Sequence, residues 1–135
     1  MSKKTITNSK GEQISVEEYD YVDFEEFVNG YAIVGKNGKE GFINESGEVI
    51  CQLKYDTVWP FRETYTPNGV RILKATRVRL NGLYGLIDIN GKEISPIKYE
   101  RIDSFDGDQK AYAESGKDSF FLDEKGNEYP IKSLI

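Results

Sequence analysis

Apolar and polar residues alternate in short runs along this chain, and several runs lead to a polar residue followed by glycine. Residues 42–44 (FIN) lead to Ser46-Gly47, and residues 86–88 (LID) lead to Asn90-Gly91. Alternation with a period of two indicates a strand with one buried face. Ser-Gly and Asn-Gly pairs supply the left-handed backbone conformations of tight hairpin turns. The pattern therefore predicts β-hairpins.

These hairpins belong to a longer repeat, which is marked by glycines at spacings of 36, 44 and 35 residues. In the first three copies a tyrosine follows the glycine by eight residues, an aliphatic residue comes three positions later, and a phenylalanine follows. A period in this range is typical of stacked or radially repeated architectures. The repeated positions are Gly11, Gly47, Gly91 and Gly126; Tyr19, Tyr55 and Tyr99; Val22, Val58 and Ile102; and Phe24, Phe61 and Phe105.

Length and composition favour one domain that spans residues 1–135. A hydrophobic content of 38% is that of a globular chain, and 13% aromatic residues favours strands. We predict an all-β fold of antiparallel hairpin repeats, with about three full or partial units plus a C-terminal partial unit, stacked or curled around a single core.

The segment 15–29 admits a second interpretation as a helix. Ser15 and Glu18 have the spacing of a capping box, and Asn29-Gly30 suits a helix C-cap. The alignment of Tyr19 and Val22 with the later copies favours an extended segment instead.

The repeat resembles that of the WG-repeat proteins, over nearly the whole chain. Residues 53–61 (LKYDTVWPF) and 95–105 (SPIKYERIDSF) match the closing stretch of that family's unit, and residues 27–34 (FVNGYAIV) resemble its linking strand. The aromatic-glycine dipeptide is eroded, reading Glu40-Gly41, Tyr84-Gly85 and Ser119-Phe120. The resemblance implies a bacterial β-repeat protein and, because most members have no assigned activity, little about function.

The second unit is eight or nine residues longer than its neighbours, and the excess lies between Phe61 and Ala75. Insertions in repeat proteins map to loops on one face, and that face often binds partners. We therefore expect a projecting loop and a candidate binding surface there.

The residues that usually carry catalysis are missing. The chain has no histidine, so it can form neither a Ser-His nor a Cys-His dyad, and its only cysteine, Cys51, lies in an apolar segment. The glycines lack the spacing of a phosphate-binding loop, and residues 123–128 (DEKGNE) read as a hairpin turn rather than a calcium loop. Adjacent Glu pairs at 17–18 and 25–26 read as a solvated rim. We predict no catalytic residues, no cofactor and no metal.

Charge and hydropathy limit the classes of partner that we expect for this chain. A net charge of -5 and a pI near 4.9 argue against nucleic acid, whose phosphates require a clustered positive surface. No apolar run reaches membrane-spanning length, and the first residues lack a signal-peptide core. We expect a cytoplasmic protein without a membrane partner, which binds another protein of basic character.

Two segments offer candidate binding residues. Residues 17–26 are acidic with interleaved aromatics, and residues flanking the insertion include an aromatic and cationic cluster. Tyr, Trp and Arg dominate binding hot spots. Alternatively, the acidic segment and the basic segment 71–79 partly neutralise each other across the fold. The candidates are Glu18, Tyr21, Glu25, Trp59, Arg62 and Tyr65.

Three functional hypotheses follow. The first is a non-catalytic protein-binding module, such as a toxin-neutralising immunity protein that covers a basic toxin surface. The second is a structural module that forms homo-oligomers through exposed hairpin edges. The third is a carbohydrate- or ligand-binding module that uses exposed aromatics as stacking platforms.

Overall fold

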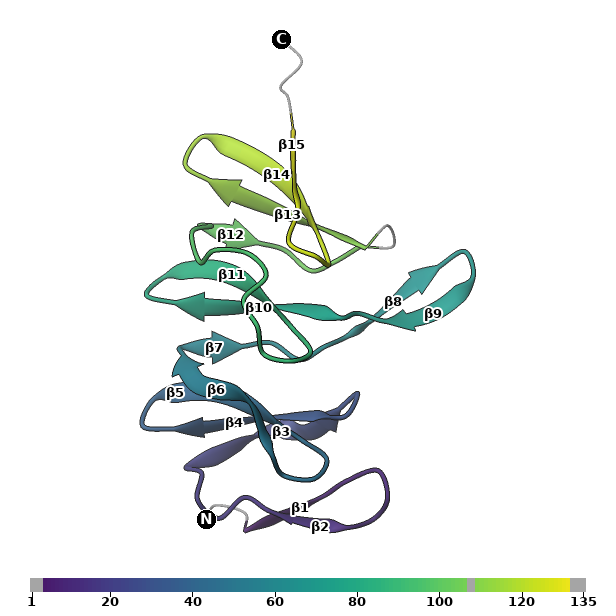
Figure 1. Cartoon of the computed structure of the whole chain (residues 1–135), viewed down its shortest axis with the longest axis vertical. Coiled ribbons are helices and arrows are strands. Elements are labelled where there is room, and N and C mark those ends of the chain that lie inside the picture. Colours follow the sequence, from purple (N-terminus) through teal and green to yellow (C-terminus); the bar gives the residue numbers. More distant parts are fainter. Residues whose placement is uncertain (1–3, 107–108, 132–135) are drawn as a thin grey trace.

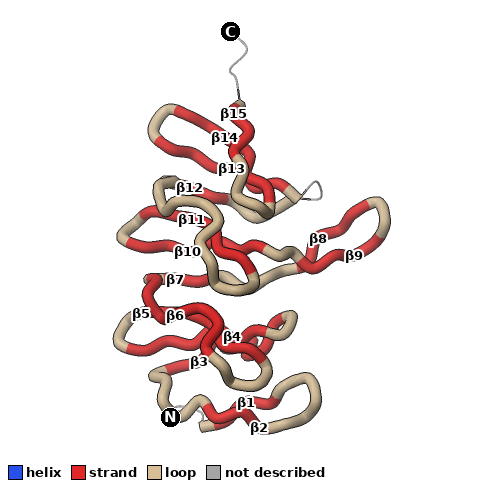
Figure 2. Tube along the Cα trace, in the orientation of Figure 1, coloured by secondary structure: helices blue, strands red, loops and turns tan. Residues whose placement is uncertain are grey.

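The computed structural model describes residues 4–106 and 109–131, a part of the chain that contains fifteen strands and no helix (Figure 2). Each strand pairing within it is antiparallel. The predicted all-β fold of antiparallel hairpins is thus confirmed. Residues 15–29 hold no helix: the Tyr19 amide donates to the Val16 carbonyl at 3.1 Å in a turn, and the strand Tyr21–Val28 follows.

Successive units lie one above another in an open stack, from an N-terminal hairpin to a C-terminal sheet (Figure 1). The hairpin consists of β1 (Thr5–Thr7) and β2 (Gln13–Ser15). The first sheet has the order β3 (Tyr21–Val28), β4 (Tyr31–Lys36), β5 (Lys39–Asn44) and β6 (Val49–Tyr55). The second has the order β11 (Leu83–Asp88), β10 (Ala75–Leu80) and β7 (Thr57–Val58). The third has the order β12 (Arg101–Ile102), β13 (Lys110–Ser115), β14 (Asp118–Asp123) and β15 (Glu128–Pro130).

The buried side chains form three clusters along the stack instead of the single core that the sequence predicted. Strand β4 shows the reason, because Ile33 belongs to the middle cluster while Ala32 and Val34 belong to the first. Strand β11 likewise sends Ile87 to the middle cluster and Leu86 to the last. These strands bury both faces, so each sheet separates two cores.

One turn recurs in all four units and accounts for the spacing of the repeat glycines. In each copy a side-chain oxygen accepts hydrogen bonds from the amides two and four residues later, at 2.9–3.0 Å. The glycine between these amides has a φ of 77–85°, which favours a residue without a Cβ. The accepting residues are Asn8, Asn44, Asp88 and Asp123. The turn predicted for residues 123–128 is therefore confirmed.

Asp123 shows how strongly this turn holds its acceptor. Burial alone would raise the pKa of the Asp123 carboxyl, but hydrogen bonds from Asn127, from the Tyr129 hydroxyl and from the Lys125 amide outweigh it and lower the pKa to about 2. The carboxylate is thereby engaged within its own turn.

The glycines of the eroded dipeptide are required for a different reason. A Cβ on Gly41 would meet the backbone of Cys51 and Gln52, and a Cβ on Gly85 would lie 2.8 Å from the Ile97 side chain and 3.1 Å from the Pro96 oxygen. Following segments of chain pass directly over these two positions, so any side chain there would displace those segments.

The repeated tyrosines tie each unit to the turn of the next one. The Tyr55 hydroxyl donates to Glu93 Oε2 at 2.7 Å, and the Tyr99 hydroxyl donates to Glu128. The preceding lysine also reaches the same carboxylate, with Lys54 Nζ at 3.5 Å from Glu93 and Lys98 Nζ at 3.0 Å from Glu128. We call this arrangement the Lys-Tyr-Glu clasp.

The first unit lacks the clasp. Tyr19 occupies the tyrosine position, but Glu18 stands in place of the lysine and Val49 in place of the glutamate. The Tyr19 hydroxyl is buried without a hydrogen-bond partner in the described residues, and burial together with the adjacent Glu18 raises its pKa. An orphaned buried hydroxyl costs about 1–3 kcal/mol.

Restoring the missing groups should stabilise the protein. We expect the double substitution Glu18→Lys and Val49→Glu to raise the free energy of unfolding by about 1–2 kcal/mol, because Tyr19 gains an acceptor and the new charges pair. Val49→Glu alone should gain less, since it places a carboxylate near Glu18. Urea denaturation of the wild type, the two single variants and the double variant measures the coupling free energy between the two substitutions. A double variant no more stable than wild type would contradict the clasp.

Phe24 departs from its predicted place in the repeat. Phe61 is buried and Phe105 is partly buried, whereas the side chain of Phe24 is 90% exposed. The tyrosine-to-phenylalanine spacing is one residue shorter in the first copy, and the β3 ladder shifts register between Val22 and Phe27. This bulge turns Phe24 outward, so the phenylalanine of the first copy does not share the burial of Phe61 and Phe105.

Candidate functional site

The insertion in the second unit forms a β-hairpin that projects sideways from the stack (Figure 1). It consists of β8 (Glu63–Thr66) and β9 (Gly69–Ile72), which pair only with each other. The predicted projection is therefore present, as an ordered hairpin rather than a loop. We refer to residues 63–72 as the arm.

The two faces of the arm differ in character. Tyr65 pairs with Val70, and Glu63 pairs with Ile72, so these four side chains share one face. Tyr65 is 76%, Val70 59% and Ile72 49% exposed. The opposite face carries Thr64, which is buried. Contiguous exposed apolar side chains of this kind are typical of interaction surfaces.

The buried face holds the arm against the C-terminal part of the stack. The Thr64 hydroxyl donates to the Asp106 carbonyl at 2.9 Å, and Arg71 Nη1 lies 2.5 Å from Glu124 Oε1. The other oxygen of Glu124 accepts the Lys74 amide at 2.6 Å. Because an isolated two-stranded hairpin is marginally stable, these contacts explain how the arm keeps its shape away from the sheets.

The foot of the arm is fixed to the first sheet by two of the candidate residues. Arg62 forms a bidentate pair with Glu25, with nitrogen-to-oxygen distances of 2.7 and 2.8 Å. The Arg62 hydrogen bond lowers the pKa of Glu25, and the same bond raises the pKa of Arg62. Phe24, next to Glu25, therefore lies within one residue of a direct contact to the arm.

The remaining acidic-segment candidates lie apart from the arm. The Tyr21 ring covers Gly35, and its hydroxyl donates to Glu40 Oε2 at 2.5 Å. Burial and then the Glu40 bond raise the pKa of Tyr21. Tyr21 is thus engaged in packing of the first sheet. Glu18 is exposed, at the position where the clasp is missing.

Trp59 is half-buried and stacked between two neighbours. The Arg77 guanidinium lies 4.7 Å from the indole centroid, and the Tyr84 ring centroid lies 5.7 Å away at an interplanar angle of 38°. Arg77 Nη1 also donates to the Ile102 carbonyl at 2.8 Å. The indole and the guanidinium are therefore held together in one orientation.

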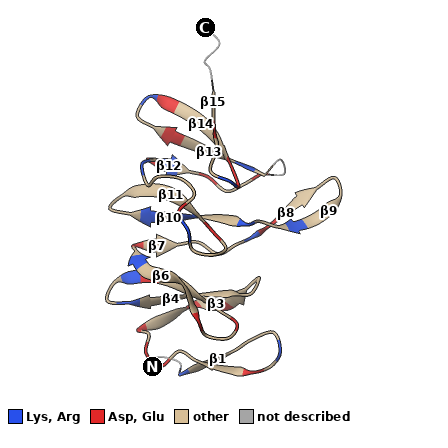
Figure 3. Ribbon diagram, in the orientation of Figure 1, with Lys and Arg blue, Asp and Glu red and all other residues tan. Residues whose placement is uncertain are grey.

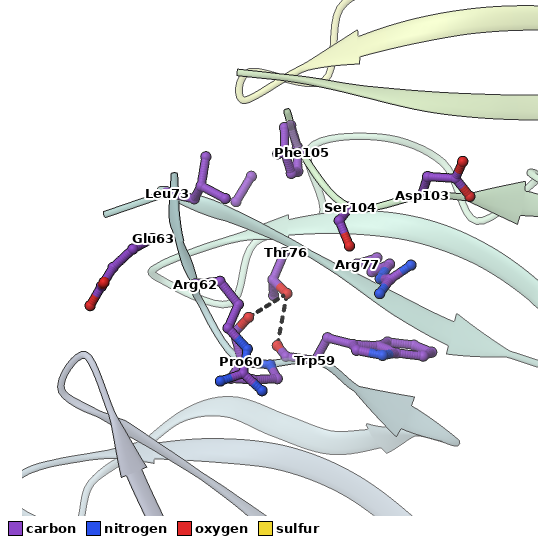
Figure 4. Close-up of a pocket in the computed structure, with 11 residues that line it drawn as sticks. Trp59, Pro60, Arg62, Glu63, Leu73, Thr76, Arg77, Asp103, Ser104 and Phe105 are labelled. Carbon is purple, nitrogen blue, oxygen red and sulfur yellow. Dashed lines mark hydrogen bonds between the residues drawn. The ribbon is translucent and has the colours of Figure 1, made fainter. Parts of the chain in front are cut away.

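A cleft of about 380 Å³ opens at the foot of the arm (Figure 4). Residues near the ends of β7 and β8, the start of β10 and the segment after β12 surround it, so it draws on two layers of the stack. Pro60, Leu73, Ala75 and Phe105 give it apolar walls, and Arg77 and Ser104 add polar groups. Trp59 and Arg62 also line it, which brings two of the six candidates to one place.

Acidic and basic residues are spread along the stack (Figure 3). The acidic segment 17–26 reaches Lys4 and Arg62, while Arg71 pairs with Glu124 and Arg77 stacks on Trp59. That the two stretches partly neutralise each other stays a prediction.

Three exposed apolar residues near the arm were not among the sequence candidates: Phe24, Val70 and Ile72. Alternation within residues 69–72 marks a strand, but only pairing with Tyr65 reveals that Val70 and Ile72 share its exposed face. For Phe24 the available signal was its spacing from Tyr19, which is one residue shorter than in the other copies.

The sequence pattern described as WG containing repeat matches residues 8–39, 41–64 and 84–114, more than half of the chain. The chain belongs to the WG-repeat family. The matched WG segments leave out residues 65–83, so Tyr65, Val70 and Ile72 lie in an addition to the WG pattern. No curated protein and no solved structure gives a significant match to the chain.

Other parts of this WG-repeat protein offer little chemistry. Cys51 is buried, as its apolar surroundings predicted, and burial raises the pKa of its thiol to about 11. Within residues 4–106 and 109–131, no three His, Cys, Asp or Glu side chains converge to hold a metal, and no helix is long and apolar enough to cross a membrane.

Proposed function

We propose that this WG-repeat protein is a non-catalytic protein-binding module, and that the exposed face of the arm is its docking surface. The strongest support is that the exposed apolar side chains of the arm lie on an ordered hairpin. Tyr65, Val70 and Ile72 are solvent-exposed on a hairpin that is fixed to the stack through Arg62, Thr64 and Arg71. A surface ordered before binding loses less entropy when a partner docks.

Phe24 is a further exposed aromatic residue, on the first sheet and next to the Glu25–Arg62 pair. Its exposure arises from a β-bulge in which Glu26 has a φ of 58°, a conformation that is uncommon for residues other than glycine. Backbone strain of this kind clusters at functional positions. We therefore include Phe24 in the docking surface, together with the Glu25–Arg62 pair that joins β3 to the arm.

For the partner, we propose a protein of opposite charge, and within that class a toxin whose basic active site is covered by this chain. The net charge of -5 supports it, because complementary charge accelerates association. A cytoplasmic location and the absence of catalysis belong to the same proposal.

The test is affinity capture from the native host, followed by calorimetry with the purified captured protein. We expect a stoichiometric complex whose affinity falls by about 100-fold when Tyr65→Ser and Ile72→Ser are combined, because central aromatic and aliphatic anchors carry most of the binding energy. Leu83→Ser is the matched control, since Leu83 is 36% exposed at the start of β11, outside the arm. Equal affinity of the arm variant and wild type would contradict the proposal.

A self-assembly role is the second candidate, because the outer edges of β8 and β9 have no strand partner within the described chain. Concentration-dependent light scattering by the purified protein would favour it over a heterologous partner. Carbohydrate binding through the exposed Phe24 and Tyr65 rings stays a prediction from the sequence, to be checked on a glycan array.

A further inference from the structure

We propose that the cleft at the foot of the arm binds a carboxylate: an Asp, Glu or C-terminal carboxylate of the docked protein partner. This inference rests on the proposed protein-binding function and names a chemical group that the partner must supply. The cleft differs from the arm face in its chemistry, since it combines apolar walls with one oriented guanidinium.

Arg77 is the group that carries the inference. Its guanidinium stacks on the Trp59 indole and, among the described residues, donates one hydrogen bond, to the Ile102 carbonyl. In the described part of the chain it has no carboxylate partner, which leaves most of its five N–H donors available. A guanidinium fixed by stacking presents its planar fork with little loss of side-chain entropy, and this fork matches the two oxygens of a carboxylate.

The other charges around the cleft are already paired or lie at its rim. Arg62 is committed to Glu25, and Asp103 accepts two hydrogen bonds from Arg101, at 2.8 and 3.0 Å. Figure 4 shows Glu63 directed away from Arg77, on the opposite side of the cleft. One available cation with acidic neighbours suits a monoanion, whereas the rim carboxylates would repel a dianionic phosphate.

The apolar walls of the cleft determine which kind of chemical group can carry the bound carboxylate. Leu73 and Phe105 offer apolar surface across the cleft from Arg77, and Ala75 also lines it, so a group that joins methylenes or a ring to a carboxylate can contact both kinds of surface. Glu63 lines the cleft and also lies on the same face of the arm as Tyr65. The cleft therefore borders the docking surface, and one partner can reach both.

Trp59 is the only tryptophan of the chain, which makes the cleft directly observable. The experiment titrates the full-length protein with 3-phenylpropionate and follows Trp59 fluorescence. The uncharged 3-phenylpropionamide and the dianionic phenyl phosphate serve as comparisons. We expect saturable binding of the carboxylate in the range of about 1–10 mM, and at least about tenfold weaker binding of both comparison ligands.

Arg77→Gln should weaken 3-phenylpropionate by about tenfold or more, because it removes the charge-assisted fork. Arg79→Gln is the matched control: Arg79 lies two residues along β10, over Tyr84 and outside the cleft, and its loss should change binding by less than about twofold. Should Arg77→Gln fail to fold, Arg77→Lys keeps the charge without the fork and should still weaken binding several-fold. Equal binding of acid and amide, tighter binding of phenyl phosphate, or equal effects at Arg77 and Arg79 would overturn the proposal.

The arm variant separates this proposal from the function on which it rests. Combined Tyr65→Ser and Ile72→Ser leaves the cleft residues intact and should bind 3-phenylpropionate as wild type does. If that variant retains full affinity for the native partner while the carboxylate still binds at Arg77, the proposed docking surface is contradicted and the proposed carboxylate site is supported. If partner binding requires the arm and the carboxylate shows no saturable binding, the cleft fails alone.

Discussion

Replacing Gly91 with alanine is expected to lower the free energy of unfolding by about 4 kcal/mol, a large fraction of the roughly 5–15 kcal/mol that holds an ordinary domain folded. Two costs combine at this residue. Its φ of 77° is unfavourable for a residue with a Cβ, and the added carbon would lie 2.6 Å from the Ile50 oxygen and 2.9 Å from the Cys51 Cα. Both are backbone atoms of the preceding unit, which cannot move without shifting a layer.

The chain provides its own control for this substitution. Gly82 has a φ of 83° in the turn between β10 and β11, and a Cβ there would meet nothing within 4 Å. Gly82→Ala should therefore cost only the backbone strain, about 1 kcal/mol. Thermal or urea unfolding of both variants measures the difference, which reports contact between units. Similar losses at the two positions would show that the layers do not require this close approach.

Removing one hydroxyl from the clasp should have the second largest effect. We expect Tyr55→Phe to cost about 2 kcal/mol, because Tyr55 is fully buried and its hydroxyl donates to the Glu93 carboxylate. Tyr19→Phe is the matched comparison at the equivalent position of the first unit, where the hydroxyl has no acceptor. That change should be neutral or should stabilise by up to about 1 kcal/mol. Urea unfolding at pH 7 distinguishes the two.

The loss at Tyr55 should also depend on pH in a defined direction. Burial, followed by the Glu93 hydrogen bond and charge, raises the pKa of Tyr55 above its usual value of 10.0. A raised pKa in the folded state favours the neutral hydroxyl, so this stabilisation is complete below about pH 10 and is lost as the pH rises further. The difference in stability between wild type and Tyr55→Phe should therefore be constant from pH 7 to 9 and should shrink above pH 10. A difference that grows with pH would contradict this account.

The sequence predicts most of the fold because each hairpin is encoded locally. The turn at Asp88 and Gly91 needs only the residues between them, so spacing and alternation suffice to locate it. The inserted arm was located by the same means, as an excess of residues between two well-matched segments. Division of the core into three clusters was not predicted, because alternation shows that a strand has two faces but not that neighbouring layers cover both.

The candidate site depends on contacts that a linear pattern does not contain. Glu25 and Arg62 are 37 residues apart in sequence. They come into contact only because the layer that contains Arg62 stacks on the first sheet. The cleft requires the same alignment to bring Arg77 and Phe105 to the foot of the arm. Residue type and position beside the insertion indicated Arg62 and Trp59 as binding candidates. The side chain that contacts each of them is known only once the layers are stacked.

The roots of the arm reach beyond the layer that contains them. Arg62 attaches it to the first sheet, while Thr64 and Arg71 attach it to the third unit, so the hairpin links the layers on both sides of its own. Repeat arrays otherwise couple each layer only to its neighbours. A partner that binds the arm would therefore stiffen the layers to which the arm is attached, in addition to covering a surface. Its binding energy would also oppose the separation of these layers.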